Sequence, residues 1–291
     1  RAEALAVIEA FAATDMGAAC RVLRGREMEQ FAPALRPGLA GALLSPHEIR
    51  VESREAIPQL TAWLAGQGVA FLPRMAVSAV EEGAVVTPAG RFAAKRIIVC
   101  PGPDLATLFP EVMARHAVTL CKLHMLKIAA PGFALPAPVM SDLGLVRYLG
   151  YAALPQAAGL RARLEAEQAQ ALADGIHLIA VQGADGSLVV GDSHHYGPAH
   201  DPFQPRGVDD GILDELRAVL AIDRPEVIER WIGIYPSGPA ACFTEAPFPG
   251  VRLVLVTSGT GASTAFAIAE ETIAEMTGAA APAHTAEGWY G

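Results

Sequence analysis

The pattern of apolar and polar positions suggests that the chain is organised around the stretch RLVLVTSGTGASTAFAIAEETIAEMTG, residues 252–278. Its apolar run 253–256 is typical of a buried parallel strand, and a turn of small residues at 258–263 follows. Phe266, Ile268 and Ile273 then recur with helical spacing until Gly278. Such a strand, glycine turn and helix start can bind an anion, because unpaired N–H groups and the positive end of the helix dipole point above the turn. A tight loop that serves packing alone is the alternative.

Other periodic segments predict a mixture of helices and strands. Helices are expected at 1–13, 27–31, 53–66, 157–173 and 209–222, with Ser53 as an N-cap. Strands are expected at 20–23, 41–45, 69–72, 76–80, 84–87, 91–94, 96–100, 118–128, 145–151, 176–182, 187–192 and 229–235, and a loop at 236–249. The alternation in 118–128 predicts a half-buried antiparallel strand on which Lys122 and His124 share a face.

Length and charge narrow the class of protein. A chain of 291 residues can form two domains. The net charge of −9 and the lack of Lys/Arg runs argue against nucleic-acid binding. The widely spaced cysteines form no CxxC, which predicts free thiols in a reducing, cytoplasmic compartment. No uncharged apolar stretch has the length of a membrane span, so no membrane association is expected.

The order of the segments is similar to that of a known family. RIIVCPG at 96–102 precedes an alternating central region, WxGxYP at 231–236 follows that region, and the strand–SGTGASTAF–helix unit ends the series. This order resembles the FAD-dependent amine and amino-acid oxidases of the D-amino-acid oxidase superfamily, which includes glycine and sarcosine oxidases. The segments CKLHMLK, RYLGY, VVGDSHHYG and GVDDGILDELRAVL most resemble a subgroup associated with aminophosphonate breakdown.

The resemblance implies an α/β fold, α+β overall, in two parts. Residues 1–116 and 229–291 would form a Rossmann-like FAD-binding domain, and residues 117–228 an antiparallel-sheet substrate domain. The family's first βαβ unit, with its GxGxxG turn, does not occur in these 291 residues. Because the chain begins directly in a helical pattern at Arg1, we expect a further segment before that residue.

The resemblance also implies the position of the cofactor. Pro101 and Gly102 match a small-residue turn beside the flavin, and Val77 matches a position that meets the adenine side. No cysteine matches the flavin-linking position of sarcosine oxidases, so the FAD is expected to be non-covalent. The residues that match the turn against the isoalloxazine and ribityl groups are Gly259, Thr260, Gly261, Ala262, Ser263 and Thr264.

An acidic substrate tail would need cationic groups in the central region. Arg147 with Tyr148 is the first candidate, because a guanidinium matches the oxygens of a carboxylate or phosphonate. Lys122, His124 and His194 are further candidates for binding the substrate. The alternatives are a solvated arginine on an edge strand, an exposed outer face, and a histidine that caps a turn.

Other constellations in this region are weaker. His194 and His195 have no third ligand at a fixed spacing, so no metal is expected. Consecutive residues at 192–194 point to opposite faces of a strand, which argues against a hydrolase triad. Trp231 and Tyr235 either line a pocket or belong to the core.

These observations lead to the hypothesis of an FAD-dependent oxidoreductase. The predicted reaction is the oxidative deamination of a small amine with an acidic tail, most of all an aminophosphonate, with O2 or another electron acceptor. An amino acid or N-methylamino acid of the glycine or sarcosine type is the next substrate class. Since the GxGxxG unit does not occur here, a non-catalytic fragment or binding module is the alternative.

Overall fold

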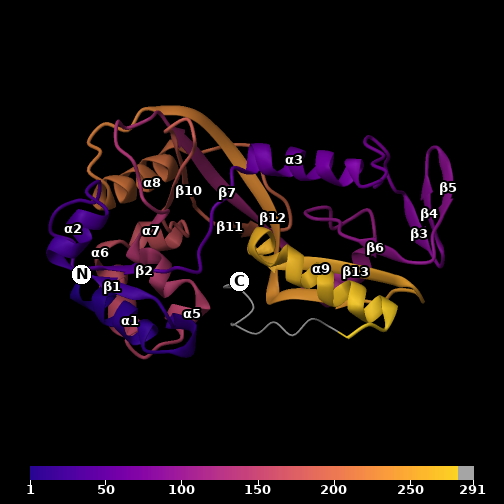
Figure 1. The fold of residues 1–291 in the computed structure, drawn as a ribbon, viewed down its shortest axis with the longest axis horizontal. Coiled ribbons are helices and arrows are strands. Elements are labelled where there is room, and N and C mark those ends of the chain that lie inside the picture. Colours follow the sequence, from indigo (N-terminus) through magenta and orange to yellow (C-terminus); the bar gives the residue numbers. More distant parts are fainter. Residues whose placement is uncertain (281–291) are drawn as a thin grey trace. The chain divides into compact units, whose positions relative to one another are not determined.

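The computed structural model describes residues 1–280, and their contacts divide into two compact units. Unit 1 comprises Arg1–Gly68, Lys122–His195 and Asp201–Gly233. Unit 2 comprises Val69–Cys121, Tyr196–His200 and the chain from Ile234. The strands β7 (Thr119–Ile128) and β12 (Val227–Glu245) contribute residues to both units. The fold is mixed α/β, as the sequence predicts (Figure 1).

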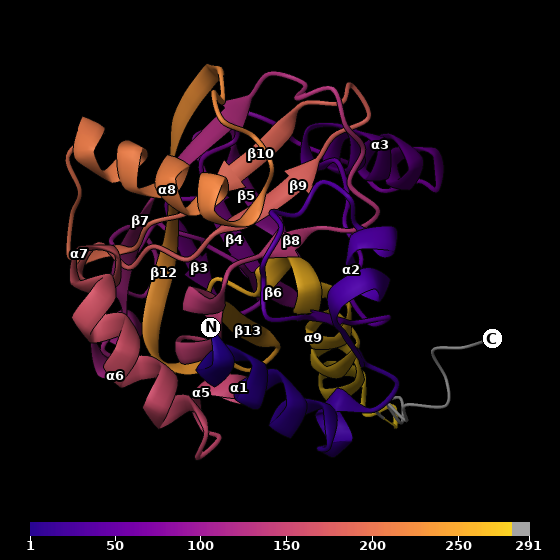
Figure 2. The ribbon, with the colours of Figure 1, turned by 90° about the vertical axis from the view of Figure 1, so that its left-hand side faces the viewer.

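An antiparallel sheet forms the frame of unit 1. Within this unit β7, β10 (Leu188–Gly191), β9 (Ile179–Gln182) and β8 (Val139–Met140) are neighbours in that order. The predicted hairpin is confirmed, with Leu188 opposite Gln182 and the tight turn closed at Gly186, whose φ is +78°. The helix α8 (Arg206–Val219) lies over this sheet (Figure 2).

The helices of unit 1 pack their apolar stripes on the sheet and on one another. Leu160 and Leu164 of α6 and Ile212 and Leu216 of α8 are fully buried, at the spacing of one helix face. Each such side chain contributes about 1.5–3 kcal/mol by leaving water. The remaining elements of this unit are α1 (Ala2–Ala12), η1 (Asp15–Gly17), β1 (Arg21–Leu23), α2 (Gly25–Phe31), β2 (Ala42–Leu44), α3 (Ser53–Gly66), η2 (Asp142–Val146), α5 (Leu149–Ala152), α6 (Ala157–Glu167) and α7 (Ala169–Ala173).

Unit 2 is organised by a pair of parallel strands. β6 (Ile97–Val99) and β13 (Val251–Ser258) pair through Ile97↔Val251 and Val99↔Leu253, and the second half of β12 pairs with β13 on its other side. The helix α9 (Gly261–Thr277) follows β13 and packs against it (Figure 1). The other elements are the meander β3 (Ala79–Glu81), β4 (Ala84–Thr87) and β5 (Gly90–Ala93), the helix α4 (Pro110–Arg115), and β11 (His195–Gly197) at the border of the two units.

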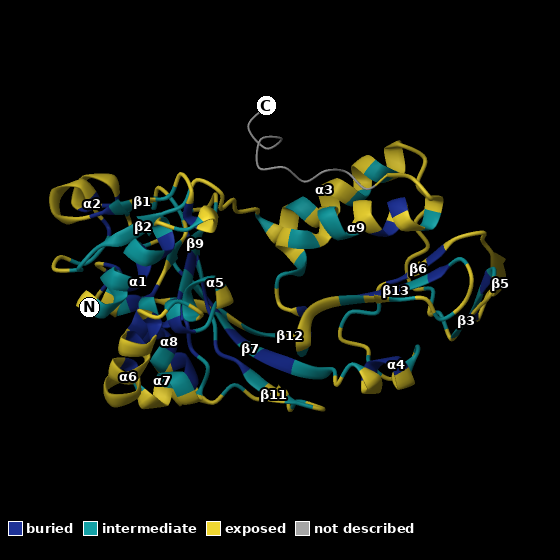
Figure 3. Cartoon of the chain, turned by 90° about the horizontal axis from the view of Figure 1, so that it is seen from below, coloured by how far each residue is buried: buried dark blue, intermediate teal, exposed yellow. Residues whose placement is uncertain are grey.

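The core of unit 2 lies on one face of this strand pair. In β6 the buried Ile97 and Val99 flank the exposed Ile98, whereas the middle of β13 is buried on both faces from Leu253 to Leu255. The cluster comprises Val80, Ile97, Val99, Val112, Met113, Val251, Leu253 and Leu255. In Figure 3 the strands β6 and β13 are partly dark blue and partly teal, whereas much of α9 and α3 is exposed.

Some local predictions are wrong. Residues 145–151 do not form a strand but the end of η2, a turn and α5. The buried residues Leu143 and Val146 are three apart, which suits a helical turn, and the amides of Arg147 and Tyr148 donate to the carbonyl of Gly144.

Two further segments differ from the predicted type of secondary structure. Residues 69–72 are exposed and form no strand, whereas the expected loop at 236–249 continues β12 as far as Glu245. The register shift between Ser237 and Cys242 accommodates Pro239, which cannot donate to a regular ladder.

Smaller differences concern element ends. Glu52, not Ser53, is the N-cap residue of α3, and it makes no side-chain capping bond. The helix expected at 157–173 is divided at Gln168 into α6 and α7.

Contacts group residues 1–68 with the antiparallel sheet of unit 1, while the division into cofactor and substrate domains stays a prediction. In the described chain, no helix has the length and apolar character needed to cross a membrane.

Candidate functional site

Two glycine turns follow the parallel strands of unit 2. β6 leads into Pro101 and Gly102, and β13 leads into Gly259. Both glycines have positive φ, +59° at Gly102 and +75° at Gly259, which other residues adopt only with strain. Because parallel strands point the same way, both turns lie at the carboxyl end of the pair, where α/β folds bind their ligands.

The start of α9 is suited to a ligand with negative or carbonyl oxygens. Thr260 is its N-cap residue, and in residues 1–280 no side chain caps the first turn. Ala262 and Ser263 are exposed, so the backbone there is accessible to a ligand. A Cβ at Gly259 would lie 3.1 Å from the ring of Tyr235, so glycine allows the close approach of the two. The predicted residues 259–264 thus form one small-residue turn. The amides of Ser263 and Thr264 donate to the carbonyl of Thr260, which leaves Gly261 and Ala262 to offer first-turn N–H groups to a ligand.

The other cofactor prediction concerns Val77. It precedes β3 and packs against the core cluster of unit 2. Its place near an adenine group stays a prediction.

A buried polar cluster lies in unit 1, beyond the ends of the β9–β10 hairpin. The backbones of His177 and Asp192 exchange two hydrogen bonds, of 3.2 and 3.1 Å. The Oη atom of Tyr148 lies 2.8 Å from Nε2 of His177, whose Nδ1 lies 3.2 Å from Oδ1 of Asp192. His194 Nε2 lies 3.8 Å from Oδ2 of Asp192. The cluster therefore joins two predicted residues, Tyr148 and His194, to two that the sequence did not single out for substrate binding.

Burial sets the protonation states in this cluster. Burial first, together with the positive charge of Arg147, lowers the pKa of His177 to about 3 and that of His194 to about 4. Burial also raises the pKa of Asp192 to about 7 and that of Tyr148 to about 12. At neutral pH both imidazoles are neutral and the phenol keeps its proton.

Arg147 belongs to this cluster through its charge. It is half-buried at the C-cap of η2, and its charge acts on His177, Asp192 and His194 alike. The structure thus brings together Arg147, Tyr148 and His194, three of the predicted substrate-binding residues.

Lys122 and His124 lie in a second polar network of the same unit. Both are buried on β7, and they share one strand face, as predicted. Lys122 Nζ lies 3.2 Å from Oδ1 of Asp201 and donates to the carbonyl of Phe203. Because this ammonium group has internal partners, its role in substrate binding stays a prediction.

His124 is held by an aspartate of α8. Its Nδ1 lies 3.2 Å from Oδ1 of Asp209, whose Oδ2 accepts a hydrogen bond of 3.1 Å from Nε of Arg230. Ser193 accepts from the amide of His124 and also contacts His195. This chain of contacts fastens β7 and β12 to α8, and the role of His124 toward a substrate stays a prediction.

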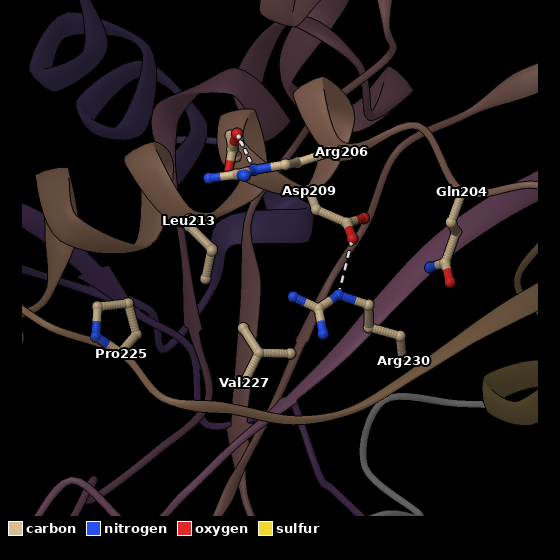
Figure 4. Close-up of a pocket in the computed structure, with 8 residues that line it drawn as sticks. Gln204, Arg206, Asp209, Leu213, Pro225, Val227 and Arg230 are labelled. Carbon is tan, nitrogen blue, oxygen red and sulfur yellow. Dashed lines mark hydrogen bonds and ion pairs between the residues drawn. The ribbon is translucent and has the colours of Figure 1, made fainter.

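A surface groove of about 530 Å³ adjoins this network (Figure 4). Its two arginines each face an aspartate: Arg230 pairs with Asp209, and Arg206 pairs with Asp210 at 3.3 Å. The charges of the groove thus balance within the chain. The lining residues are Gln204, Arg206, Asp209, Asp210, Leu213, Pro225, Val227 and Arg230.

Trp231 and Tyr235 lie on β12 but in different units. The guanidinium of Arg54 lies over the Trp231 ring, 5.5 Å from its centroid. Tyr235 packs against Gly259 in unit 2. Of these two residues, Tyr235 is therefore the one beside the predicted flavin turn.

A comparison with family models shows to which protein family the chain belongs. Residues 1–275 match the model of the DAO family, described as FAD dependent oxidoreductase. The chain belongs to this family. The resemblance to the D-amino-acid oxidase superfamily is thereby confirmed, and FAD is the cofactor of the DAO family.

Solved structures show the same fold. Glycine oxidase from Geobacillus kaustophilus is 18% identical with a TM-score of 0.69, over 91% of this chain and 65% of that one. Glycine oxidase from Bacillus cereus is 14% identical with a TM-score of 0.72, over 95% of this chain and 70% of that one. L-amino acid deaminase from Proteus vulgaris is 17% identical with a TM-score of 0.65, over 95% and 64%. No curated protein sequence matches the chain.

The chain therefore spans about two thirds of the length of these DAO relatives. The turns after β6 and β13 fit the family's cofactor, because the positive φ of both glycines and the accessible N–H groups of α9 allow its polar groups to approach the backbone. In the described residues, no disulfide joins the four cysteines. Cys242, expected in a loop, lies on the strand β12.

We predict that Asp209→Ala destabilises unit 1 much more than Asp210→Ala. The Asp209 side chain is 5% exposed and holds His124 and Arg230, whereas that of Asp210 is 54% exposed. Removing one partner from a buried charged network costs about 3–5 kcal/mol, and a surface change costs within about 0.5 kcal/mol. Urea unfolding of both variants measures the difference, and equal free energies of unfolding would contradict the structural role of Asp209.

Proposed function

We propose that this protein takes part in the FAD-dependent oxidation of a small primary or secondary amine with an acidic tail. The observation that carries the proposal is the match of residues 1–275 to the DAO family, joined to the two glycine turns at the carboxyl end of β6 and β13. FAD supplies the chemistry when bound, because its ring accepts a hydride equivalent from the carbon that bears the nitrogen. The residues of the chain hold the cofactor and orient the substrate.

The turns supply the cofactor contacts in this proposal. The N–H groups at the start of α9 and the positive end of its dipole would hold oxygens of the flavin part of FAD. Pro101 and Gly102 form the second turn at the same end of the strand pair. The contact is non-covalent, since no cysteine occurs in either turn.

For the acidic tail, the proposal assigns Arg147 and Tyr148. A guanidinium binds two oxygens of a carboxylate or phosphonate at once, and the phenol of Tyr148 keeps its proton and can donate to a third. A phosphonate has three such oxygens, which favours the aminophosphonate class. The segments around Lys122, Tyr148 and His194 also resemble the aminophosphonate subgroup.

An amino acid is the second candidate substrate. Two of the structural relatives are glycine oxidases and a third is an L-amino acid deaminase. Amino acids carry the same amine next to a carboxylate, which Arg147 would bind through two oxygens. In either case O2 or another acceptor takes the electrons, and the lack of disulfides among the described cysteines is compatible with the cytoplasm.

We expect substrate-dependent bleaching of the flavin absorption with small aminophosphonates. The measurement is an anaerobic spectrum of the FAD-loaded protein after addition of 2-aminoethylphosphonate, glycine or sarcosine. Arg147→Gln should weaken binding of the reactive compound by roughly 10-fold or more, because a charged hydrogen bond contributes about 1.5–3 kcal/mol. Arg206→Gln is the matched control, since the Arg206 side chain is 91% exposed.

The results separate the candidates. Bleaching by glycine or sarcosine but not by aminophosphonates would reject the aminophosphonate class and keep the amine oxidation. No bleaching by any small amine would contradict the proposed function.

We predict that Gly259→Ala weakens FAD binding roughly 5- to 30-fold. A Cβ there would lie 3.1 Å from the Tyr235 ring, and relief of this contact and of about 1–2 kcal/mol of strain at φ +75° would displace the turn whose N–H groups face the cofactor. Gly278→Ala is the matched control: it imposes the same strain at φ +71° on the other end of α9, where no atom lies within 4 Å. Fluorescence titration with FAD measures both. Equal losses in the two variants would contradict a contact at the start of α9.

A further inference from the structure

We infer that His177, Asp192 and His194 bind one divalent transition-metal ion in unit 1. The site would use two imidazole nitrogens and one carboxylate. It does not depend on the proposed amine oxidation, and its residues belong to one compact unit. The predicted absence of a metal was drawn from His194 and His195 alone, because the sequence does not reveal that His177 lies beside Asp192.

The possible ligand atoms of the three residues lie close together. His177 Nδ1 lies 3.2 Å from Asp192 Oδ1, and His194 Nε2 lies 3.8 Å from Asp192 Oδ2. One ligand atom from each of the three residues lies within 4.8 Å of the others. Bonds of about 2.0–2.2 Å to zinc place neighbouring ligand atoms roughly 3–3.5 Å apart. The group is therefore near a metal geometry, and small side-chain rotations complete it.

The outer nitrogens of both histidines have the contacts that metal-bound imidazoles usually make. His194 Nδ1 lies 2.9 Å from the carbonyl oxygen of Gly175, an acceptor, so this nitrogen carries the proton. His177 Nε2 lies 2.8 Å from the hydroxyl of Tyr148. Each contact orients the ring so that its other nitrogen faces Asp192. Such outer contacts fix the tautomer of a metal ligand.

Two buried polar atoms in the cluster lack a hydrogen-bond partner within the described residues. His177 is 2% exposed, and within the described chain its Nδ1 and the Oδ1 atom of Asp192 have no hydrogen-bond partner of good geometry. Buried polar atoms without a partner are rare, because each costs free energy. A metal ion between these two atoms would satisfy both.

The backbone holds the three residues in place. His177 and Asp192 exchange backbone hydrogen bonds just beyond the hairpin, and the amide of His194 donates to the carbonyl of Asp174. A site fixed by neighbouring strand ends needs little reorganisation on binding.

The donor set indicates the class of metal. Two imidazoles and one carboxylate suit Zn²⁺, Fe²⁺, Co²⁺ or Mn²⁺ and leave at least one position open. Arg147 adds a positive charge near the cluster, which opposes a cation. Asp192 supplies one negative charge when it binds the metal as a carboxylate, because a metal displaces the proton of its ligand. An anionic ligand at the open position would therefore strengthen metal binding, and Zn²⁺ is a suitable probe.

The test is a calorimetric titration of the chelator-treated protein with Zn²⁺. We expect the wild type to bind one ion per chain. Loss of an outer contact lowers metal affinity roughly 10- to 100-fold, and we expect Asp192→Asn, which loses a ligand, to lower the affinity by more than that. Tyr148→Phe removes only an outer contact of His177, so the Zn²⁺ affinity of this variant should fall by no more than that roughly 10- to 100-fold range. His47→Ala, a histidine on an exposed loop, is the control and should bind as the wild type does. Thermal unfolding without metal checks that all variants are folded.

A second readout does not depend on variants. With Zn²⁺ on Nδ1, His177 must carry its proton on Nε2 and donate it to Tyr148, and ¹⁵N NMR of the ring nitrogens distinguishes this tautomer. Failure to bind one Zn²⁺ per chain would overturn the inference. So would equal affinity in wild type and Asp192→Asn, or a His177 ring whose Nδ1 stays protonated in saturating Zn²⁺. The cluster would then be a Tyr148–His177–Asp192 hydrogen-bond chain.

Discussion

The parallel pairing of β6 with β13 is the constraint on which the proposed cofactor site depends. Val99 opposite Leu253 brings together strands about 150 residues apart in the chain and gives them one direction. Both strands then lead into glycine turns at the same end of the pair, and the second turn begins α9. The apolar faces of the two strands, buried with Val112 and Met113, hold this arrangement in unit 2.

Unit 1 differs from unit 2 in that it buries several ionisable groups, whose charges need partners. Asp209 bonds His124 and Arg230 at once, so that its charge is compensated. In the other cluster, burial keeps His177 and His194 neutral, and only part of the bonding capacity is met. Within residues 1–280 the first network also leaves one buried polar atom without a hydrogen-bond partner, Nε2 of His124, but only in the second cluster do two such atoms, Nδ1 of His177 and Oδ1 of Asp192, face each other. For this reason we assign binding to the cluster of His177, Asp192 and His194.

The local parts of the site were predictable from the sequence. The apolar run, the small-residue turn and the helix ended by Gly278 are all present, because strand, turn and helix signals agree there. The hairpin at 183–186 was predictable for the same reason. In contrast, the apolar residues around Arg147 and Tyr148 suited a strand as well as a helical turn, and packing of Leu143 and Val146 decided between them.

Contacts across the sequence were not predictable. Counting back from the hairpin turn brings residue 177 within one position of facing residue 192, but their direct pairing depends on a local shift of register beyond Gly191. Likewise, the sequence placed Lys122 and His124 on one face correctly, yet their partners Asp201 and Asp209 lie about 80 residues further along the chain.

The central claim is that the backbone at the ends of β6 and β13 contacts FAD. Amide hydrogen exchange of the protein with and without saturating FAD tests it most directly, since exchange reports protection at single segments. The account predicts slower exchange at Gly102 and at 259–264 and little change at His124 or Asp209. Unchanged exchange in both turns, or protection confined to other segments, would contradict it.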